Sequence, residues 1–262
     1  MRTLTKLASM QHYELLVFFF VIACVYASVG FGGGSSYLAI MALYAMPFKE
    51  MRLAALICNI IVVAGGTLVY IKHKQVNWRK ILPLVVLSIP AAFLGAKLKL
   101  SQELFFIILG CSLLLASVLL WIQTKYSDKE FEAKEDTYVK DGLIGGVIGF
   151  LSGMVGIGGG IFLSPILNLS KWDTSKKIAA TASFFILVNS IAGIAGQLVD
   201  APDNINYKQI GLLCAAVLVG GQIGSRISAL KFDHLWVRRI TAVLVFIAGI
   251  EVLNKQLHWI NI

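Results

Sequence analysis

The sequence predicts an all-α polytopic membrane protein made of two inverted repeats, each a glycine-broken helical hairpin plus about three transmembrane helices. Of the 262 residues, 58% are hydrophobic and only 14% are charged, whereas a soluble domain carries about a quarter charged residues. Lys, Arg, Asp and Glu are absent from residues 15–48, 53–71, 81–96, 104–122, 142–170, 178–199 and 209–225. Because a transmembrane helix needs about 20 mostly apolar residues, these stretches predict several crossings and exclude a soluble enzyme.

The first helix of each half is predicted to break at a glycine run. Residues 15–48 form an uncharged stretch of 34 residues, which would be about 51 Å long as one helix. A hydrocarbon core is only about 30 Å thick, so one straight span does not fit. We therefore expect a helix over 13–29, a membrane helix and not a removable signal peptide, followed by a shorter helix over 35–46. The same reasoning breaks 142–170 at 156–160.

The two halves of the chain repeat each other. VGFGGG at 29–34 and VGIGGG at 155–160 share five of six positions at an offset of 126. Two further pairs follow at an offset of 129: NWRKI at 77–81 with NYKQI at 206–210, and LGAK at 94–97 with IGSR at 223–226. The same order of matches in both halves indicates an internal duplication.

A charged linker separates the repeats. Residues 125–141 hold 10 of the 37 Lys, Arg, Asp and Glu residues, and a mixed-sign run of this kind is typical of a solvated connection. The predicted organisation is therefore a first transmembrane repeat over 1–124, the linker over 125–141, and a second transmembrane repeat over 142–262.

The distribution of basic residues favours an inverted arrangement of the repeats. If each broken segment crosses the membrane once, Lys and Arg divide 12 to 11 between the two sides. If each is a hairpin that returns to its own side, the division becomes 15 to 8. Cytoplasmic loops are enriched in Lys and Arg, so the hairpin model is favoured, and it places both termini on the non-cytoplasmic side.

The glycine runs predict a binding site for a small anion. Glycine permits positive φ, and unwound backbone at membrane depth is tolerated only where protein buries it or where it lines a polar cavity. The helix that follows each run begins with N–H groups that lack helical partners and carry the positive end of the helix dipole. The predicted binding glycines are Gly30, Gly32, Gly33, Gly34, Gly156, Gly158, Gly159 and Gly160. The alternative is that both runs are GxxxG packing seams.

Polar side chains near the glycine runs extend this prediction. Ser35, Ser36 and Ser164 lie just beyond the runs and would add hydroxyl donors to the backbone N–H groups. Further candidates within apolar stretches are Asn59, Thr181, Ser183 and Asn189. Intramembrane Asn, Ser and Thr also tie helices together, and that alternative stays open for each of the four. Near segment ends, Gln197 and Gln222 are expected to face loops or an entrance, and Lys97 and Arg226 to steer anions at the entrances.

The paired GxGGG motifs, one early in each half of a hydrophobic chain of this length, resemble the TauE/SafE sulfite exporter family. The Gly95-Ala96-Lys97 and Gly224-Ser225-Arg226 helix ends fit the same pattern. The resemblance implies transport of sulfite, sulfoacetate or another small organosulfur anion across a bacterial cytoplasmic (inner) membrane. We therefore predict a secondary anion transporter with a site near the midplane. A channel-like anion pore with the same site is the alternative.

Other functional classes lack the residues they need. His12, His73, His234 and His258 all lie in loops or at segment ends, and no CxxC pair exists. The sequence therefore predicts no metal, no cofactor and no enzymatic activity. The net charge of +9 is explained by basic residues at the ends of apolar segments, so nucleic acid is not an expected partner. The expected partners are the small anion and the lipid bilayer, and the oligomeric state stays open.

Overall fold

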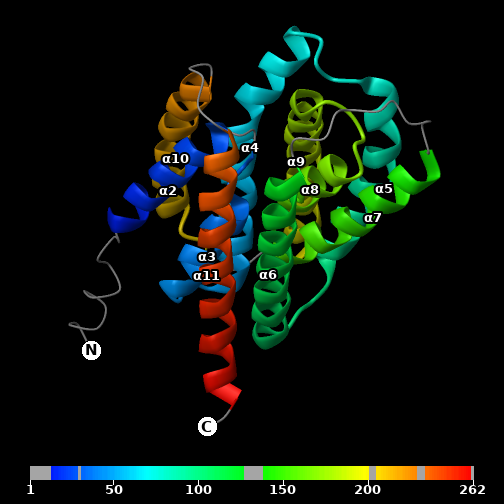
Figure 1. The fold of residues 1–262 in the computed structure, drawn as a ribbon. Coiled ribbons are helices and arrows are strands. Elements are labelled where there is room, and N and C mark those ends of the chain that lie inside the picture. The colour runs from blue at the N-terminus through cyan, green and yellow to red at the C-terminus, as the bar shows by residue number, and fades with distance from the viewer. Residues whose placement is uncertain (1–12, 29–30, 127–137, 201–204, 229–233, 261–262) are drawn as a thin grey trace, which may run out of the picture.

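The computed structural model describes residues 13–28, 31–126, 138–200, 205–228 and 234–260, and within these it contains helices and no strand (Figure 1). The first half contains α2 (Tyr13–Ser28), α3 (Gly34–Leu43), α4 (Phe48–Lys72), α5 (Trp78–Lys97) and α6 (Gln102–Tyr126). The second contains α7 (Tyr138–Val155), α8 (Gly160–Leu169), α9 (Ser175–Gln197), the 3-10 turn η1 (Leu198–Asp200), α10 (Tyr207–Ser228) and α11 (His234–Ile260).

Six of the described helical segments are long and apolar enough to cross a membrane. They are Phe48–Lys72, Trp78–Lys97, Gln102–Thr124, Tyr138–Val155, Ser175–Asp200 and Tyr207–Arg226. Large apolar side chains lie exposed on their outer faces, such as Leu68 at 67%, Val86 at 57% and Val147 at 62%. Exposed apolar surface on this scale requires a lipid environment. The predicted class, an all-α polytopic membrane protein, is confirmed.

Both glycine runs break a helix, as the sequence predicts. The first helix ends at Ser28 and the next begins at Gly34, against predicted helices of 13–29 and 35–46. In the second half, α7 ends at Val155 and α8 begins at Gly160. Each half is thus a broken pair of helices followed by three long helices.

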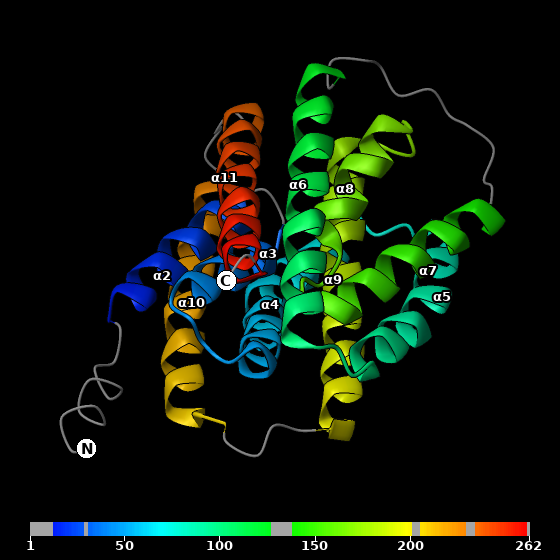
Figure 2. The ribbon, with the colours of Figure 1, turned by 90° about the horizontal axis from the view of Figure 1, so that it is seen from below.

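The halves interlock by exchanging helices. The first helix of each half packs on the fourth helix of the other, so that α7 lies against α5 and α2 against α10 (Figure 2). Likewise α8 packs on α6 and α3 on α11, while α4 contacts α9 and α6 contacts α11. In Figure 1, α6 and α11 lie side by side and run in opposite directions. This pattern is unchanged when the halves are exchanged, as an inverted repeat requires; the inversion across a membrane stays a prediction.

Glycines allow the exchanged helices to touch backbone to backbone. A Cβ added at Gly95 of α5 would collide with the carbonyl oxygen of Phe150 in α7, and one at Gly224 of α10 with that of Cys24 in α2. These two contacts are equivalent positions of the repeat. Close approach of this kind replaces the hydrophobic effect as the source of helix association in a membrane.

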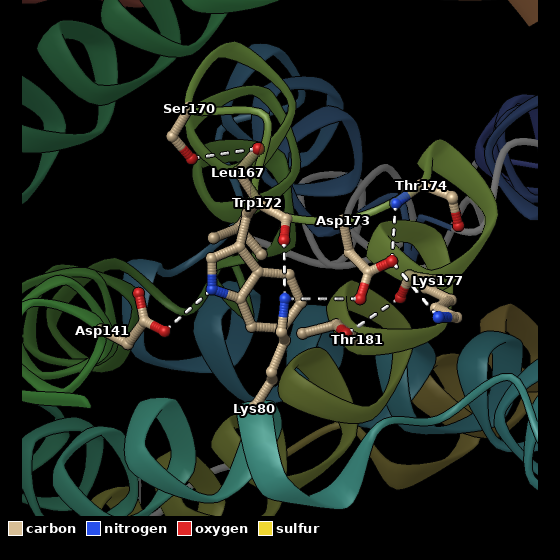
Figure 3. A network of polar contacts seen from close by, with 9 residues as sticks. All are labelled: Lys80, Asp141, Leu167, Ser170, Trp172, Asp173, Thr174, Lys177 and Thr181. Carbon is tan, nitrogen blue, oxygen red and sulfur yellow. Dashed lines mark hydrogen bonds and ion pairs between the residues drawn. The ribbon is translucent and has the colours of Figure 1, made fainter. Parts of the chain in front are cut away.

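Polar contacts fix the loop after each short helix. In Figure 3, Trp172 lies between α7 and α5: its Nε1 donates to Oδ2 of Asp141 at 2.8 Å, and its carbonyl accepts from Nζ of Lys80 at 3.0 Å. At the equivalent place in the first half, Oη of Tyr44 donates to Oε2 of Glu14 at 2.7 Å. The tip of each broken hairpin is therefore tied to the start of its own first helix.

Helix packing predicts opposite outcomes for two neighbouring glycines of α7. A Cβ at Gly145 would overlap the carbonyl oxygen of Leu84, whereas one at Gly146 makes ordinary contact with Leu87 at 3.6 Å. Gly145→Ala should destabilise the protein by about 1–3 kcal/mol through overpacking, and Gly146→Ala by much less. The measurement is the thermal transition of both purified variants in detergent. Equal transitions would show that α5 and α7 are not packed this closely.

The inverted arrangement predicts that residues 5 and 133 lie on opposite sides of the membrane. Thr5→Cys and Ala133→Cys, each in a background without the native cysteines, should therefore be labelled by an impermeant maleimide from opposite sides of intact cells. Labelling of both from the same side would contradict the 15-to-8 charge argument.

A candidate anion site where the two glycine runs meet

The two glycine runs meet around the side chain of Asn59. Asn59 lies in α4, is fully buried, and its Nδ2 donates to the carbonyl oxygen of Ile157 in the second run at 2.9 Å. A Cβ at Gly32 would stand 2.5 Å from Oδ1 of Asn59, and one at Gly34 would stand 2.5 Å from its Nδ2. On the other side, Gly158 would place a Cβ 2.7 Å from the same nitrogen. The Asn59 amide therefore fills the space that three absent side chains leave. We call these two runs with Asn59 the glycine cradle.

Ile186 of α9 occupies the equivalent place in the second repeat. Asn59 and Ile186 stand at the same position counted from the first residue of α4 and of α9. A Cβ at Gly32 would lie 3.3 Å from Cγ2 of Ile186, and one at Gly158 would lie 3.0 Å from it. One amide and one aliphatic side chain thus face each other where a strict repeat would place identical residues.

The backbone of both runs is shaped to present N–H groups. Gly33 and Gly159 precede α3 and α8 in the left-handed region, with φ of 87° and 82°. No side chain caps either helix start. The first backbone hydrogen bonds that span four residues are donated by the N–H of Tyr37 to the carbonyl of Gly33 at 3.0 Å and by the N–H of Leu163 to the carbonyl of Gly159 at 3.1 Å. The N–H groups at each helix start therefore lie outside the four-residue ladder, within the buried cradle.

Some of the buried polar atoms without partners in the described part of the chain lie at the cradle. Among the described residues, Oδ1 of Asn59, Oγ of Ser190 and Oη of Tyr37 are buried and have no hydrogen-bond partner. Ser190 lies 3.2 Å from the Cβ position of Gly158, and the Tyr37 ring lies against Gly33. Buried polar atoms almost always have partners, so these atoms mark a place where a polar ligand or water would be accommodated. The sequence offered Ser190 beside Asn189 as an intramembrane polar residue that either contacts substrate or ties helices together, whereas Tyr37 was not predicted.

The other predicted residues divide between the cradle and helix contacts. Ser35 and Ser36 are buried at the start of α3, where Oγ of Ser36 is 2.6 Å from Oη of Tyr26. The remaining candidates are buried in α8 and α9. Oγ of Ser164 accepts from Asn168, and Thr181 donates to the Lys177 carbonyl in the network of Figure 3. Asn189 donates to Oγ of Ser88 and to the Phe185 carbonyl, and Ser183 lies buried in the same helix as Thr181 and Asn189. Gly156, with φ of 87°, packs against Arg52. Gly30 lies outside the described residues.

A second polar feature is a pocket at one end of the bundle, which the sequence analysis did not identify. It has a volume of about 200 Å³ and lies between the start of α4, the end of α5 with the loop that follows it, and the end of α9 with η1. Its lining comprises Phe48, Lys49, Arg52, Ala96, Lys97, Leu98, Lys99, Leu100, Gly196, Gln197 and Asp200. We call it the basic pocket, because four cationic side chains face one carboxylate.

Arg52 connects the basic pocket to the second glycine run. The side chain is 4% exposed, and its Nη2 donates to the carbonyl oxygens of Ala96 at 3.2 Å and of Gly153 at 3.0 Å. These carbonyls lie in the last turns of α5 and α7, where the helix dipole favours a cation. The guanidinium also lies 6.0 Å from the centre of the Phe105 ring. The sequence signal was weak, since Arg52 borders an apolar stretch just as a loop residue does.

Metal chemistry has no cluster of ligands in the part of the chain that the structure describes. No group of three or more His, Cys, Asp or Glu residues there is placed to hold an ion. The two polar features are instead built from backbone amides, neutral side chains and cations.

The fold defines the class: this is an all-α polytopic membrane protein. The family model of the sulfite exporter TauE/SafE matches residues 15–252, so the chain belongs to this family. It is 35% identical to the probable membrane transporter protein y4hK of Sinorhizobium fredii, over 91% of this chain and 97% of that protein. It is 24% identical to the probable membrane transporter protein YunE of Bacillus subtilis, over 73% and 76%. No solved structure matches it.

Proposed function

We propose that this protein is a secondary transporter of a small anion, most simply sulfite or a small organosulfonate such as sulfoacetate. The anion binds in the glycine cradle, between the starts of α3 and α8. The protein acts in a bacterial cytoplasmic membrane with both termini on the outer side.

The observation that carries this proposal is the meeting of the two helix breaks at Asn59. Gly34 of one run lies so close that its Cβ would stand 2.6 Å from the Ile157 carbonyl of the other. Discontinuous helices that meet at a repeat interface are the usual binding geometry of secondary transporters. Two helix starts supply N–H donors and positive dipole ends to an anion without a buried fixed charge.

The described conformation has the cradle closed around its own side chains. Asn59 and Ile186 fill the space beside the glycines, so an anion binds only after they withdraw. They belong to α4 and α9, which contact each other at the interface of the repeats. Movement of α4 against α9 would withdraw both side chains together and open the cradle. A rigid-body movement of one repeat against the other is how alternating access works in transporters with inverted repeats.

Counterflow in proteoliposomes tests the transport mode. A carrier preloaded with unlabelled sulfoacetate should accumulate labelled sulfoacetate transiently above its equilibrium level and saturate with concentration. The panel should include sulfite, sulfate and acetate, because the cradle recognises charge and size. Unsaturable flux without counterflow would overturn the carrier in favour of the alternative, a channel-like pore with the same site.

Glycine variants test the site. Gly32→Ala would add a Cβ 2.5 Å from Oδ1 of Asn59 at a residue whose φ is not positive. We expect it to weaken sulfoacetate binding by about tenfold, or about 1.4 kcal/mol, because the methyl group occupies the cradle. Gly33→Ala and Gly159→Ala should weaken binding at least as much, with an added loss of stability from strain at positive φ.

The matched control is Gly66→Ala in α4, where an added Cβ meets nothing within 4 Å. Equilibrium binding to monodisperse purified variants is the measurement. Equal, small effects at Gly32 and Gly66 would show that the runs are packing seams and that the anion binds elsewhere.

A further inference from the structure

We infer that the basic pocket is a second anion site, which takes a small free oxyanion such as a sulfonate before or after its residence in the cradle. It is separate from the cradle: its walls are the ends of α4, α5 and α9, the loop after α5, and η1, and it shares none of the glycines of the two runs.

The pocket contains a buried cation that has no counter-ion among the residues the structure describes. Arg52 is 4% exposed, and among the described residues it forms no ion pair, only hydrogen bonds to two carbonyl oxygens. Removing a guanidinium from water is costly unless an opposite charge compensates it. Its Nε is buried and has no partner in the described part of the chain. An anion in the pocket would supply both the charge and the acceptor.

Gln197 adds a second unused donor. Its side chain is 8% exposed, it lines the pocket, and its Nε2 has no hydrogen-bond partner among the residues described. A buried donor without a partner destabilises the folded protein. Two residues that carry such donors line one pocket, with lysines beside them; this is the composition of an oxyanion site.

The lysines provide the charge at the rim. Asp200 pairs with Lys49 at 3.3 Å and with Lys99 at 3.7 Å, and these partners are largely exposed. Lys97 lines the pocket and forms no ion pair in the described part of the chain. The carboxylate therefore offsets only part of the positive charge, and the pocket attracts anions.

The position of these cations is unexpected for a membrane protein. Under the predicted topology, eight Lys and Arg lie on the non-cytoplasmic side, and four of them line this pocket. The positive-inside rule disfavours cations on that side, so their concentration in one hollow indicates a ligand. Phe48, Leu98 and Leu100 complete the wall with apolar surface, which suits the short carbon chain of an organosulfonate. The sidedness rests on the predicted topology, whereas the site itself does not.

The decisive variant is Gln197→Leu. It removes an unpartnered amide, so the protein without ligand should be at least as thermally stable as the wild type. Because a hydrogen bond to a charged group is worth about 1.5–3 kcal/mol, it should weaken sulfoacetate binding to the pocket by about tenfold. Lys97→Gln should weaken it several-fold and reduce its salt dependence. Lys208→Gln, an exposed cation at the same end of the bundle but outside the pocket, is the matched control and should have little effect.

Binding is measured by equilibrium dialysis of labelled sulfoacetate against the full chain in phosphatidylcholine nanodiscs, with and without Gly32→Ala to disable the cradle. We expect Gly32→Ala to leave one saturable, salt-sensitive site, which Gln197→Leu and Lys97→Gln then weaken. Complete loss of binding in Gly32→Ala, or pocket variants that bind like Lys208→Gln, would overturn the inference. If Gly32→Ala binds sulfoacetate like the wild type while the pocket variants do not bind it, the result supports the pocket as an anion site and contradicts the cradle as one.

A lipid headgroup offers the same chemistry as a free oxyanion. The dialysis is therefore repeated in nanodiscs that contain phosphatidylglycerol. Unchanged affinity supports a free anion as the occupant. Suppose that sulfoacetate binding to the pocket is lost in nanodiscs with phosphatidylglycerol but kept in phosphatidylcholine alone. This result would overturn the assignment to a free anion and would indicate that a lipid headgroup occupies the pocket.

Discussion

Backbone that leaves a helix inside a membrane must find its hydrogen-bond partners within the protein, because lipid offers none. This constraint explains the centre of the molecule. The second glycine run interrupts the helix between Val155 and Gly160, and the freed carbonyl of Ile157 is bonded by the amide of Asn59. Asn59 belongs to the other repeat, so the break in one half is satisfied by the other. The interlocked packing of α2 on α10 and α7 on α5 holds the two halves in this relation.

The two repeats have equivalent backbone contacts, but their side chains differ at the two proposed anion sites. The contacts Gly95–Phe150 and Gly224–Cys24 are equivalent, whereas Asn59 faces Ile186 and Arg52 corresponds to Ala179 when α4 and α9 are aligned from their first residues. The first repeat therefore carries both the amide of the cradle and the buried cation. A strictly symmetric pair would place two arginines at opposite ends, and each would lie buried near helix ends at a high desolvation cost.

Sequence reasoning predicted the fold more completely than the site. A glycine run within an uncharged stretch too long for one span is a local signal, and it located the helix breaks to within one residue at Ser28 and Gly34. The sequence of a buried helix such as α9 does not indicate which face turns toward a site, because apolar residues occur on nearly all of its sides. Thr181 and Asn189 are polar in the same stretch, yet one bonds its own helix and the other bonds Ser88 of α5. The burial of Arg52 was not predicted, because a charged residue at the edge of an apolar stretch is ordinarily solvated.

The two proposed anion sites differ in a way that electrostatics favours. A fixed cation at the midplane would hold the anion strongly and would itself be costly whenever the site was empty. Helix starts provide partial positive charge without that cost, and an anion in the cradle would use them. Full charges occur instead at the basic pocket, where the lysines are hydrated and Arg52 is stabilised by the carbonyls of Ala96 and Gly153. Because Gly153 belongs to the last turn of α7, immediately before the second glycine run, an anion that attracts Arg52 would also weaken a contact that holds that run in place. Occupation of the basic pocket and opening of the cradle would then be coupled through the Arg52 side chain.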